Sequence, residues 1–197
     1  MATQTERREG TRAKILAAAR ACFAADGYEA TSLEAIMTRA GVSKGALYHH
    51  FANKLGIMAA LYEHAAVHAV REGQHAALAP DIREGPALVR IVAAGLGWLK
   101  AVQDPETGSL VLDVGPRVLG WAWAREIEER YSAEPTRSAL AQAVAAGEAR
   151  CTNIGLATRI INAALSEIAL SHRETPLSEA DAAAMVRAVV KGVAGVG

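Results

Sequence analysis

Residues 41–51 read GVSKGALYHHF, and this stretch decides how the first part of the chain folds. Gly41 allows a sharp turn after a preceding helix, and Ser43 can cap the start of the next one. The helix that follows has about seven residues, and a helix this short is not stable without tertiary support. We expect Leu47 to provide that support by packing onto Ile36 of the preceding helix.

The residues before this stretch complete a three-helix unit. A first helix is predicted over 11–26, and Gly27 is expected to be its left-handed cap. A second helix is predicted over 32–39, where Thr31 and Glu34 have the spacing of a capping box. Helix, short turn and short helix have the layout of a helix-turn-helix. Its outward side chains form a polar and aromatic set that suits a DNA major groove: Lys44, Gly45, Ala46, Tyr48, His49 and His50.

The whole of residues 11–54, TRAKILAAARACFAADGYEATSLEAIMTRAGVSKGALYHHFANK, resembles the DNA-binding domain of the tetracycline-repressor-like (TetR) family. The matches include the first-helix Ile-Leu-x-Ala-Ala and Phe, the pair Gly27-Tyr28, residues 40–45, residues 47–51 and Lys54. The resemblance implies an all-helical homodimer. It also implies a variable C-terminal domain that binds a small molecule and controls DNA affinity.

The start of the short third helix is expected to read bases. Lys44, next to the Ser43 cap, can reach guanine O6 and N7 or a phosphate, and Ala46 can touch a thymine methyl group. Gly45 costs about 1 kcal/mol against Ala in a helix, but it lets the backbone approach DNA closely. His49 is a candidate base reader, and the alternative is a solvated surface histidine.

Other residues of the unit are expected to contact the DNA backbone. The resemblance implies that Tyr48, His50 and Lys54 contact phosphates. Thr31 and Ser32 lie at a helix N-terminus, where free amides attract phosphate. For His50 too, the alternative is a solvated surface position.

Charge is distributed unevenly along the 197 residues, although the net charge is zero. Residues 1–54 carry eight Lys and Arg against five Asp and Glu, a balance of +3, and residues 55–197 carry thirteen against sixteen, a balance of −3. A basic head on an acidic body suggests that the head meets a polyanion. We therefore predict a DNA-binding domain over 1–54 and a ligand-binding and dimerisation domain over 55–197, with the boundary inside a helical connection.

The rest of the chain also predicts helices, so the expected fold class is all-α. Apolar periodicity and proline positions indicate helices near 54–78, 85–103, 107–113, 116–131, 136–149, 153–172 and 178–195. The two distant cysteines, Cys22 and Cys151, read as small buried apolar residues in a reducing cytoplasm. No apolar run approaches the length of a membrane span, and the polar N-terminus is no signal peptide, so no membrane contact and a cytoplasmic location are expected.

The last two predicted helices carry more apolar surface than one chain needs. In 153–172 one stripe contains Ile161 and Ile168, while a neighbouring stripe contains Leu156 and Ile160. In 178–195 several apolar residues continue the pattern, among them Met185. One interpretation is that both are core helices. The other is that 153–172 and 178–195 form a four-helix bundle with the same helices of a twin subunit.

A mostly apolar cavity for an uncharged or weakly polar small molecule is expected between helices of residues 55–150. The candidate lining residues are Trp98, Trp121 and Trp123, with the alternative that they are core or dimer anchors. Trp121 and Trp123 lie about 200° apart on a helix, so they cannot both face inward. His64 and His68 are four residues apart, which suits zinc, but no carboxylate or thiol completes a set, so they are placed as exposed or cavity-lining residues.

No metal, no cofactor and no enzymatic activity are expected, because the sequence contains no catalytic loop or paired-carboxylate motif. The predicted function is a transcriptional regulator, a repressor released from a near-palindromic operator by a small ligand. Two rival functions remain. One is an enzyme or carrier with a vestigial helix-turn-helix, and the other is an architectural protein that binds DNA without a defined operator.

Overall fold

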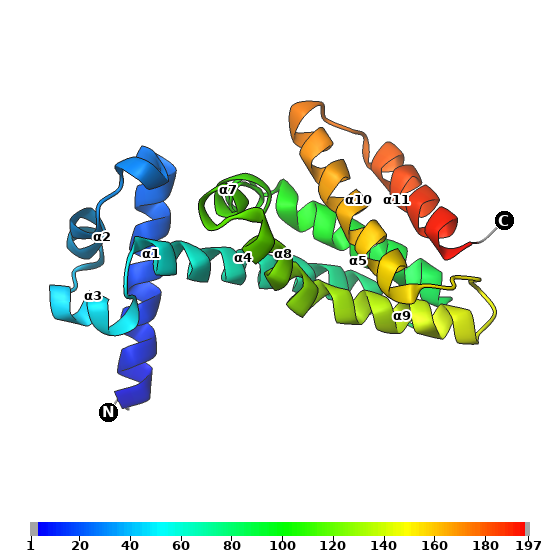
Figure 1. Ribbon diagram of the computed structural model, residues 1–197, viewed down its shortest axis with the longest axis horizontal. Coiled ribbons are helices and arrows are strands. Elements are labelled where there is room, and N and C mark those ends of the chain that lie inside the picture. The colour runs from blue at the N-terminus through cyan, green and yellow to red at the C-terminus, as the bar shows by residue number, and fades with distance from the viewer. Residues whose placement is uncertain (1–3, 196–197) are drawn as a thin grey trace.

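The computed structural model describes residues 4–195, and within this range every regular element is helical (Figure 1). The all-α fold class is thereby confirmed. The head consists of α1 (Gln4–Ala30), α2 (Leu33–Ala40) and α3 (Lys44–His50). The body contains α4 (Lys54–Ala77), α5 (Ala87–Gln103), α6 (Pro105–Ser109), η1 (Leu110–Val114), α7 (Gly115–Leu119), α8 (Trp121–Glu128), η2 (Glu129–Ala133), α9 (Glu134–Ala145), α10 (Ile154–Glu174) and α11 (Glu179–Ala194).

The head has its own small core. Ile15 of α1, Ile36 of α2 and Leu47 of α3 are fully buried in one cluster, as expected for a short helix that depends on its neighbours. Phe51, the residue after α3, is also buried there. The packing of Leu47 onto the preceding helix is therefore confirmed.

Two details of the helix ends differ from expectation. Gly27 has φ +80° and ψ 164°, an extended conformation open in practice only to glycine, instead of the left-handed cap. The cap of α2 is Ser32, whose hydroxyl accepts a hydrogen bond from the Ala35 amide, and not Thr31. Gly41 does adopt the left-handed conformation that the turn requires, with φ +64° and ψ 37°.

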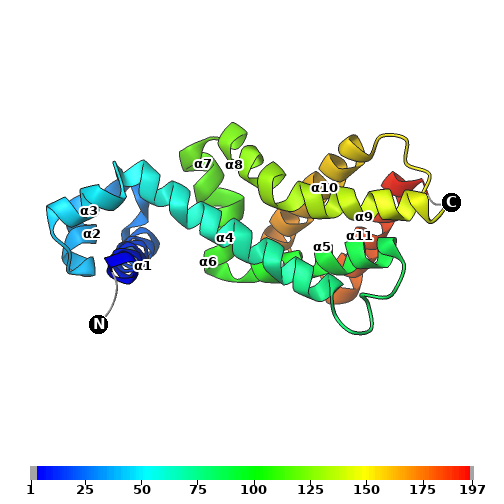
Figure 2. The same cartoon turned by 90° about the horizontal axis from the view of Figure 1, so that it is seen from below.

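α4 extends from the head into the body and packs most closely on α5 (Figure 2). Small residues allow this approach. A Cβ atom on Gly73 would lie 2.6 Å from the Ala94 carbonyl oxygen, and one on Gly97 would lie 2.8 Å from the Glu72 carbonyl oxygen. The two helices can thus lie nearly backbone to backbone, and larger side chains at either glycine would separate them.

The segment 105–145 departs furthest from the predicted helices. The predicted helix 116–131 is wrong as one unit, because Gly120 has φ +90° and separates α7 from α8. Two π-helical turns, η1 and η2, precede Pro116 and Pro135, which each lie in the first turn of the next α-helix. A proline cannot donate its amide to the previous turn, and a wider turn accommodates that missing hydrogen bond.

α10 and α11 pack side by side at the far end of the body (Figure 1). Ile161 and Ile168 are buried, whereas Leu156 and Ile160 on the neighbouring stripe are exposed, as is Met185 of α11. One face of each helix therefore packs inward, and an apolar face is left uncovered.

α10 is the one helix among the described residues that is long and apolar enough, by length and composition, to cross a membrane. It has 21 residues, and an 18-residue window within it has a mean hydropathy of 1.2. The expectation considered uninterrupted apolar runs, and α10 contains polar residues such as Arg159 and Glu167 between its apolar stripes. Because a core helix passes the same test, absence of membrane contact stays a prediction.

Candidate DNA-binding surface and ligand cavity

The outer face of α3 carries the expected set of side chains. Lys44, Gly45 and His49 are exposed, Tyr48 is 46% exposed, and Ala46 and His50 are half-buried. A Cβ atom on Gly45 would meet no atom within 4 Å. Nothing among residues 4–195 therefore requires glycine at this position, and the start of α3 presents bare backbone at the surface.

Two serines hold the helices of this face in place. Ser43 accepts a hydrogen bond from the Ala46 amide at 3.2 Å, and Ser32 accepts one from the Ala35 amide at 3.0 Å. Both are N-caps, and both helix starts face outward at exposed serines. A cap hydroxyl leaves other first-turn amides free, so both helix starts remain able to bind phosphate.

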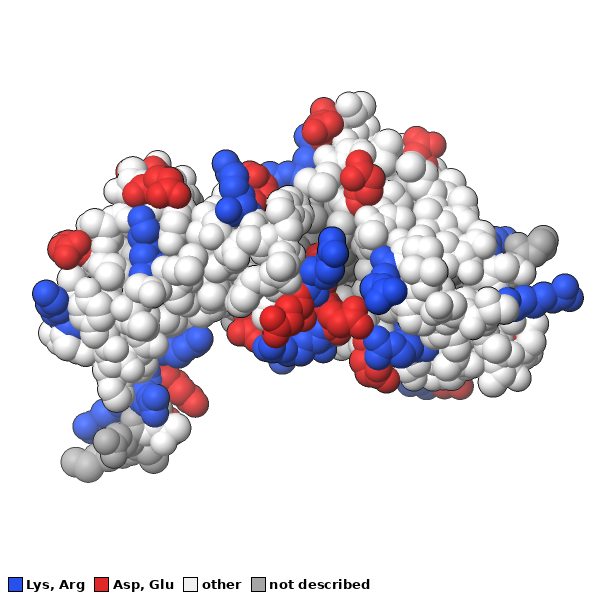
Figure 3. All heavy atoms as spheres, viewed as in Figure 1, with Lys and Arg blue, Asp and Glu red and all other residues white. Residues whose placement is uncertain are grey.

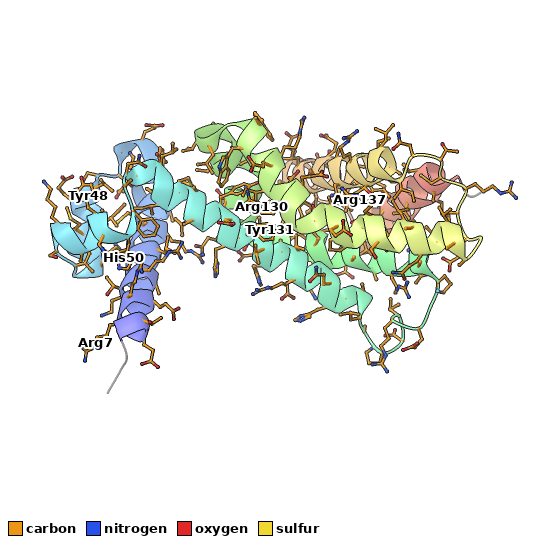
Figure 4. All side chains as sticks on the ribbon, turned by 60° about the horizontal axis from the view of Figure 1, so that its bottom comes forward. Arg7, Tyr48, His50, Arg130, Tyr131 and Arg137 are labelled. Atoms are coloured by element: carbon orange, nitrogen blue, oxygen red, sulfur yellow. The ribbon has the colours of Figure 1, made fainter. Side chains whose placement is uncertain are left out.

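The N-terminal half of α1 adds cations that the sequence analysis did not assign to DNA. Arg8 and Arg12 are exposed and lie close enough to α3 to act on His50, and the Arg12 guanidinium carbon lies 5.3 Å from the Phe51 ring centroid. Figure 3 shows blue spheres gathered at this end of the head, and Figure 4 shows Arg7 there with Tyr48 and His50 on α3. The positive balance of residues 1–54 was the available signal, but it did not indicate which cations lie beside α3.

His50 has a lowered pKa. Partial burial is the main cause, and His49, Arg8 and Arg12 add positive charge nearby. The ring of His50 lies 5.2 Å from that of His49, edge to face. The nearby positive charge disfavours protonation of His50, and the negative charge of a bound phosphate would offset it.

Lys54 does not lie where the sequence analysis placed it. Its ammonium donates to the carbonyl oxygens of Tyr28, Glu29 and Thr31, at 2.7, 3.2 and 2.9 Å. It also lies 4.4 Å from the Tyr28 ring centroid. All three donors of the ammonium are thus engaged with the segment that follows the kink in α1. The expected phosphate contact is corrected to a structural role in the head.

Thr31 is a second correction. Its side chain is 3% exposed, and its hydroxyl donates to the Gly27 carbonyl oxygen at 2.7 Å. The side chain stabilises the turn between α1 and α2, because the extended Gly27 leaves that carbonyl without a helical partner. It therefore does not belong to the outer surface.

The body contains a cavity of about 80 Å³ between α4, α5, α8, α9 and α10. Its walls are mostly apolar, and the polar residues that line it are Gln74, Glu128, Tyr131, Ser132, Thr136, Asn162 and Ser166. A larger space of about 530 Å³ is lined by residues of η1, α7, α8, η2 and α10. We call the first space the inner cavity and the second the outer groove. The two spaces share one wall, formed by Val111, Glu128, Asn162 and Ser166.

The three tryptophans have three different positions. Trp98 lines the inner cavity, as predicted. Trp121 is 64% exposed and lines only the outer groove. Trp123 lines neither space and packs edge to face on Tyr62, with ring centroids 5.5 Å apart. The prediction that Trp121 and Trp123 face opposite ways is confirmed, and Trp123 is corrected from a ligand contact to a core residue.

The histidines of α4 lie away from the cavity. His64 and His68 are exposed, and His68 Nδ1 lies 3.9 Å from the Glu72 carboxylate. They are corrected from candidate ligand contacts to surface residues, because α4 presents its alanine and glycine face inward. Among residues 4–195 no group of three or more His, Cys, Asp or Glu is arranged to hold a metal ion.

The polar residues of the cavity were missed by the sequence analysis. Glu128 belongs to a run of three glutamates with Glu126 and Glu129, of which only those two are exposed. Asn162 and Ser132 come from elements distant in sequence and meet through a hydrogen bond of 3.0 Å from Asn162 Nδ2 to Ser132 Oγ. Helical periodicity marks the inward face of α10, but it does not show that the π-turn η2 brings Ser132 to it.

Comparison with known protein families covers most of the chain. The model of bacterial regulatory proteins of the tetR family matches residues 15–61. The model of the tetracyclin repressor-like C-terminal domain matches residues 88–196, more than half of the chain. The first model thus matches the head and the start of α4, and the second matches most of the body.

Individual relatives match shorter or longer parts of the chain. The repressor AcnR of Corynebacterium glutamicum is 41% identical over 51 residues, which are 26% of this chain and 27% of AcnR. This chain thus matches less than a third of the curated relatives' length. Solved structures match along the whole chain: a TetR-family regulator from Mesorhizobium loti has a TM-score of 0.72 at 23% identity, covering 99% of this chain and 98% of that one. The SmeT–triclosan complex has a TM-score of 0.69 at 23% identity, covering 92% and 90%. At these identities the likeness of structure shows the fold.

Proposed function

The chain belongs to the TetR family of bacterial regulatory proteins, and we propose that it is a transcriptional repressor that leaves its operator when a small, mostly apolar molecule occupies the cavity of the body. The observation that carries this proposal is the outer face of α3. It has an unexplained glycine, a free lysine and a tyrosine, all beside the basic half of α1. As a regulator of chromosomal genes it would act in the cytoplasm.

In this proposal α3 enters the major groove. Lys44 and His49 contact base edges, and Tyr48, His50 and the amides after Ser32 contact phosphates. Gly45 allows the start of the helix to approach the DNA. Arg8 and Arg12 add phosphate contacts from α1, because they lie on the same side of the head as His50.

Footprinting on DNA upstream of the gene and its neighbours tests this function, with and without candidate ligands. Protection of a near-palindromic site supports it. Protection without sequence preference would indicate an architectural protein, and no binding even at low salt would indicate a vestigial helix-turn-helix.

Gly45→Ala is a sharp test of the DNA-facing role. The added methyl group meets no atom within 4 Å, so the head should fold as well as before or slightly better. Operator affinity should nevertheless fall by more than about tenfold, since the methyl group blocks the approach of the backbone. Gly10→Ala, in the exposed part of α1 and equally free of contacts, is the matched control. Equal effects of the two substitutions would contradict the role of Gly45.

Lys44→Ala separates base reading from simple attraction. We expect the order of preference among operator variants to change, and Tyr48→Phe to weaken binding to all of them alike. Binding measurements on a panel of operator variants distinguish the two. Retention of the wild-type order by Lys44→Ala, with a uniform loss of affinity, would assign Lys44 to phosphate.

We further propose that the repressor is a homodimer formed by α10 and α11. The uncovered apolar residues Leu156, Ile160 and Met185 support this, since two such helix pairs make a four-helix bundle. The two α3 helices of such a dimer would bind half-sites about 34–36 Å apart. Ile160→Glu should produce monomers in sedimentation experiments. Val89→Glu is the matched control, because Val89 and Ile160 are both 43% exposed and Val89 lies on α5.

Release from DNA follows from linkage. If the occupied cavity favours a spacing of the two heads that does not match successive major grooves, ligand and DNA reduce each other's affinity by the same factor. Measuring ligand affinity with and without operator DNA gives this factor. Equal ligand affinities in the two measurements would mean that the two sites are not coupled.

A further inference from the structure

Glu128 is the one carboxyl group that lines the inner cavity within residues 4–195. It is the last residue of α8, and its side chain belongs to the wall that the cavity shares with the outer groove. Most of the surrounding wall is apolar, including Ile91, Ile127 and Leu165. An ionised carboxylate in such a place costs free energy unless a cation or several hydrogen-bond donors compensate it.

The neighbouring glutamates all have such a cation. Glu126 pairs with Arg130 at 2.9 Å, and Glu129 and Glu134 pair with Arg137 at 2.8 and 2.9 Å. These pairs lie on the outside of the body, where Figure 4 shows Arg130 and Arg137. Residues 126–134 lie within the part of the chain that the structure describes and contain four glutamates. Of these four, Glu128 alone has no ion pair. Arg130 and Arg137 are thus engaged with surface carboxylates, whereas Arg125 and Arg159 line the outer groove with Glu128 and form no ion pair with it.

The polar groups around Glu128 do not compensate it either. Asn162 donates to the Ser132 hydroxyl, and that hydroxyl donates to the backbone carbonyl of Glu128 at 2.6 Å. The hydroxyl of Tyr62 is fully buried and has no hydrogen-bond partner. Burial raises the pKa of Tyr62, and Glu128 raises it further. Burial likewise raises the pKa of Glu128, against a smaller opposite effect of Arg125.

From this arrangement we propose that the molecule that occupies the cavity is a small apolar amine, and that its ammonium group binds the Glu128 carboxylate. The inference rests on the proposed function, since it names the class of ligand that would release the repressor. The apolar walls and Trp98 contact the hydrocarbon part of the ligand, and Glu128 contacts the cation. An ammonium supplies both the charge and the hydrogen-bond donors that the protein does not provide at this carboxylate.

The size of the cavity limits the ligand. A space of about 80 Å³ is smaller than a cavity of about 150 Å³ that holds one benzene molecule. A compact alkyl amine fits within it, whereas the ring of an aryl-alkyl amine would have to extend past Glu128 into the outer groove.

The test uses matched pairs of ligands that differ only in the charged group, beginning with butylamine and 1-butanol and continuing with phenethylamine and 2-phenylethanol. Calorimetric titration of the full-length protein measures each affinity. We expect the amine to bind more tightly than the alcohol, and Glu128→Gln to weaken amine binding by about 10- to 100-fold while changing alcohol binding less than about twofold. Glu126→Gln removes a charge from the same helix outside the cavity and is the control.

The outcomes are distinct. A selective loss of amine binding in Glu128→Gln, absent in Glu126→Gln, supports the proposal. Equal binding of amine and alcohol in every pair, equal losses for both in Glu128→Gln, or no binding of any amine would overturn it. Operator binding of the ligand-free protein is measured in parallel. A protein that binds its operator but shows no preference for amines keeps the proposed function and loses this ligand class, whereas absence of operator binding contradicts the function itself.

Discussion

The head and the body of this protein are stabilised in different ways. In the head, polar groups at the helix ends have specific partners: Ser32 and Ser43 cap α2 and α3, and Lys54 binds three carbonyl oxygens after α1. In the body, side-chain caps also start α4, α6, α10 and α11, but the helices in addition approach one another closely at small residues, as at Gly73 and Gly97 between α4 and α5. Both regions thus use specific caps, and the body depends in addition on volume and shape.

The two kinds of contact constrain the sequence differently. A hydrogen-bonded cap needs a particular side chain, so it leaves a recognisable sequence. A packed interface accepts many combinations of apolar residues of the right total volume. Accordingly, the fold of nearly the whole chain is shared with solved structures at only 23% sequence identity.

The largest expected effect tests the packing of the body. A Cβ atom on Gly115 would lie 2.2 Å from both the Leu110 carbonyl oxygen and the Tyr62 ring. Gly115→Ala should therefore lower the free energy of unfolding by about 3 kcal/mol, measured by denaturant titration. Gly10→Ala, which creates no contact, should leave it unchanged or slightly increased. If Gly115→Ala were as stable as wild type, close packing would not be what stabilises this part of the body.

The next effect tests the hydrogen bonds of the head by comparing two lysines. Lys54→Ala leaves the carbonyl oxygens of Tyr28, Glu29 and Thr31 without their donor. We expect a loss of about 2 kcal/mol in unfolding free energy. Lys44→Ala, on the exposed face of α3, should change stability by less than about 0.5 kcal/mol and affect DNA binding alone. If Lys44→Ala lowered the unfolding free energy more than Lys54→Ala did, the structural role of Lys54 would be contradicted.

A smaller effect should appear as a pH dependence of operator binding through His50 of the head. Burial and the cations around His50 lower its pKa in the free protein, and a bound phosphate would raise that pKa again. Binding then takes up a proton, so operator affinity should rise as pH falls, by at most about tenfold per pH unit. The rise should level off below the lowered pKa of the free protein. His50→Gln should flatten the profile, and His64→Gln, on the exposed side of α4, should not.

The smallest expected effect lies where the two regions meet. Arg20 of α1 and Glu106 of α6 form an ion pair at 2.7 Å, and both side chains are well exposed. Exposed pairs contribute at most about 1 kcal/mol, so Arg20→Gln should reduce stability by less than that, and added salt should remove the difference. A loss of several kcal/mol would show that this contact, and not the continuous α4, holds head and body together.

Sequence alone predicted most of the head and less of the body. The turn at Gly41 and the cap at Ser43 agree with expectation, because each depends on residues within one turn. The burial of Leu47 against Ile15 and Ile36 also agrees, because the apolar face of each short helix marks its inward side. Gly120 and the π-turns before Pro116 and Pro135 were not predicted. A proline within a helical pattern can be preceded by a break or by a wider turn. Which of the two forms depends on the residues that pack around it.

The candidate sites divide along the same line. Local pattern placed Lys44, Gly45, Tyr48 and His49 on the outer surface of α3, and the structure agrees. It did not distinguish Lys44 from Lys54, because the carbonyl oxygens that bind Lys54 are more than twenty residues away in sequence. The domain boundary at 54–55 stays a prediction, and it falls at the start of the unbroken helix α4.

The short stretch GVSKGALYHHF and its flanking helices by themselves determined the helix-turn-helix and the family of this protein, because turns, caps and helix faces are set by residues close together in the chain. Only the tertiary structure decided that Lys54 is structural, that Arg8 and Arg12 lie beside α3, and that Glu128 faces a cavity while Glu126 and Glu129 face solvent. The physical reason is that burial, the partners of a charged group and the shape of a cavity arise from elements far apart in sequence. No local pattern specifies where those elements meet.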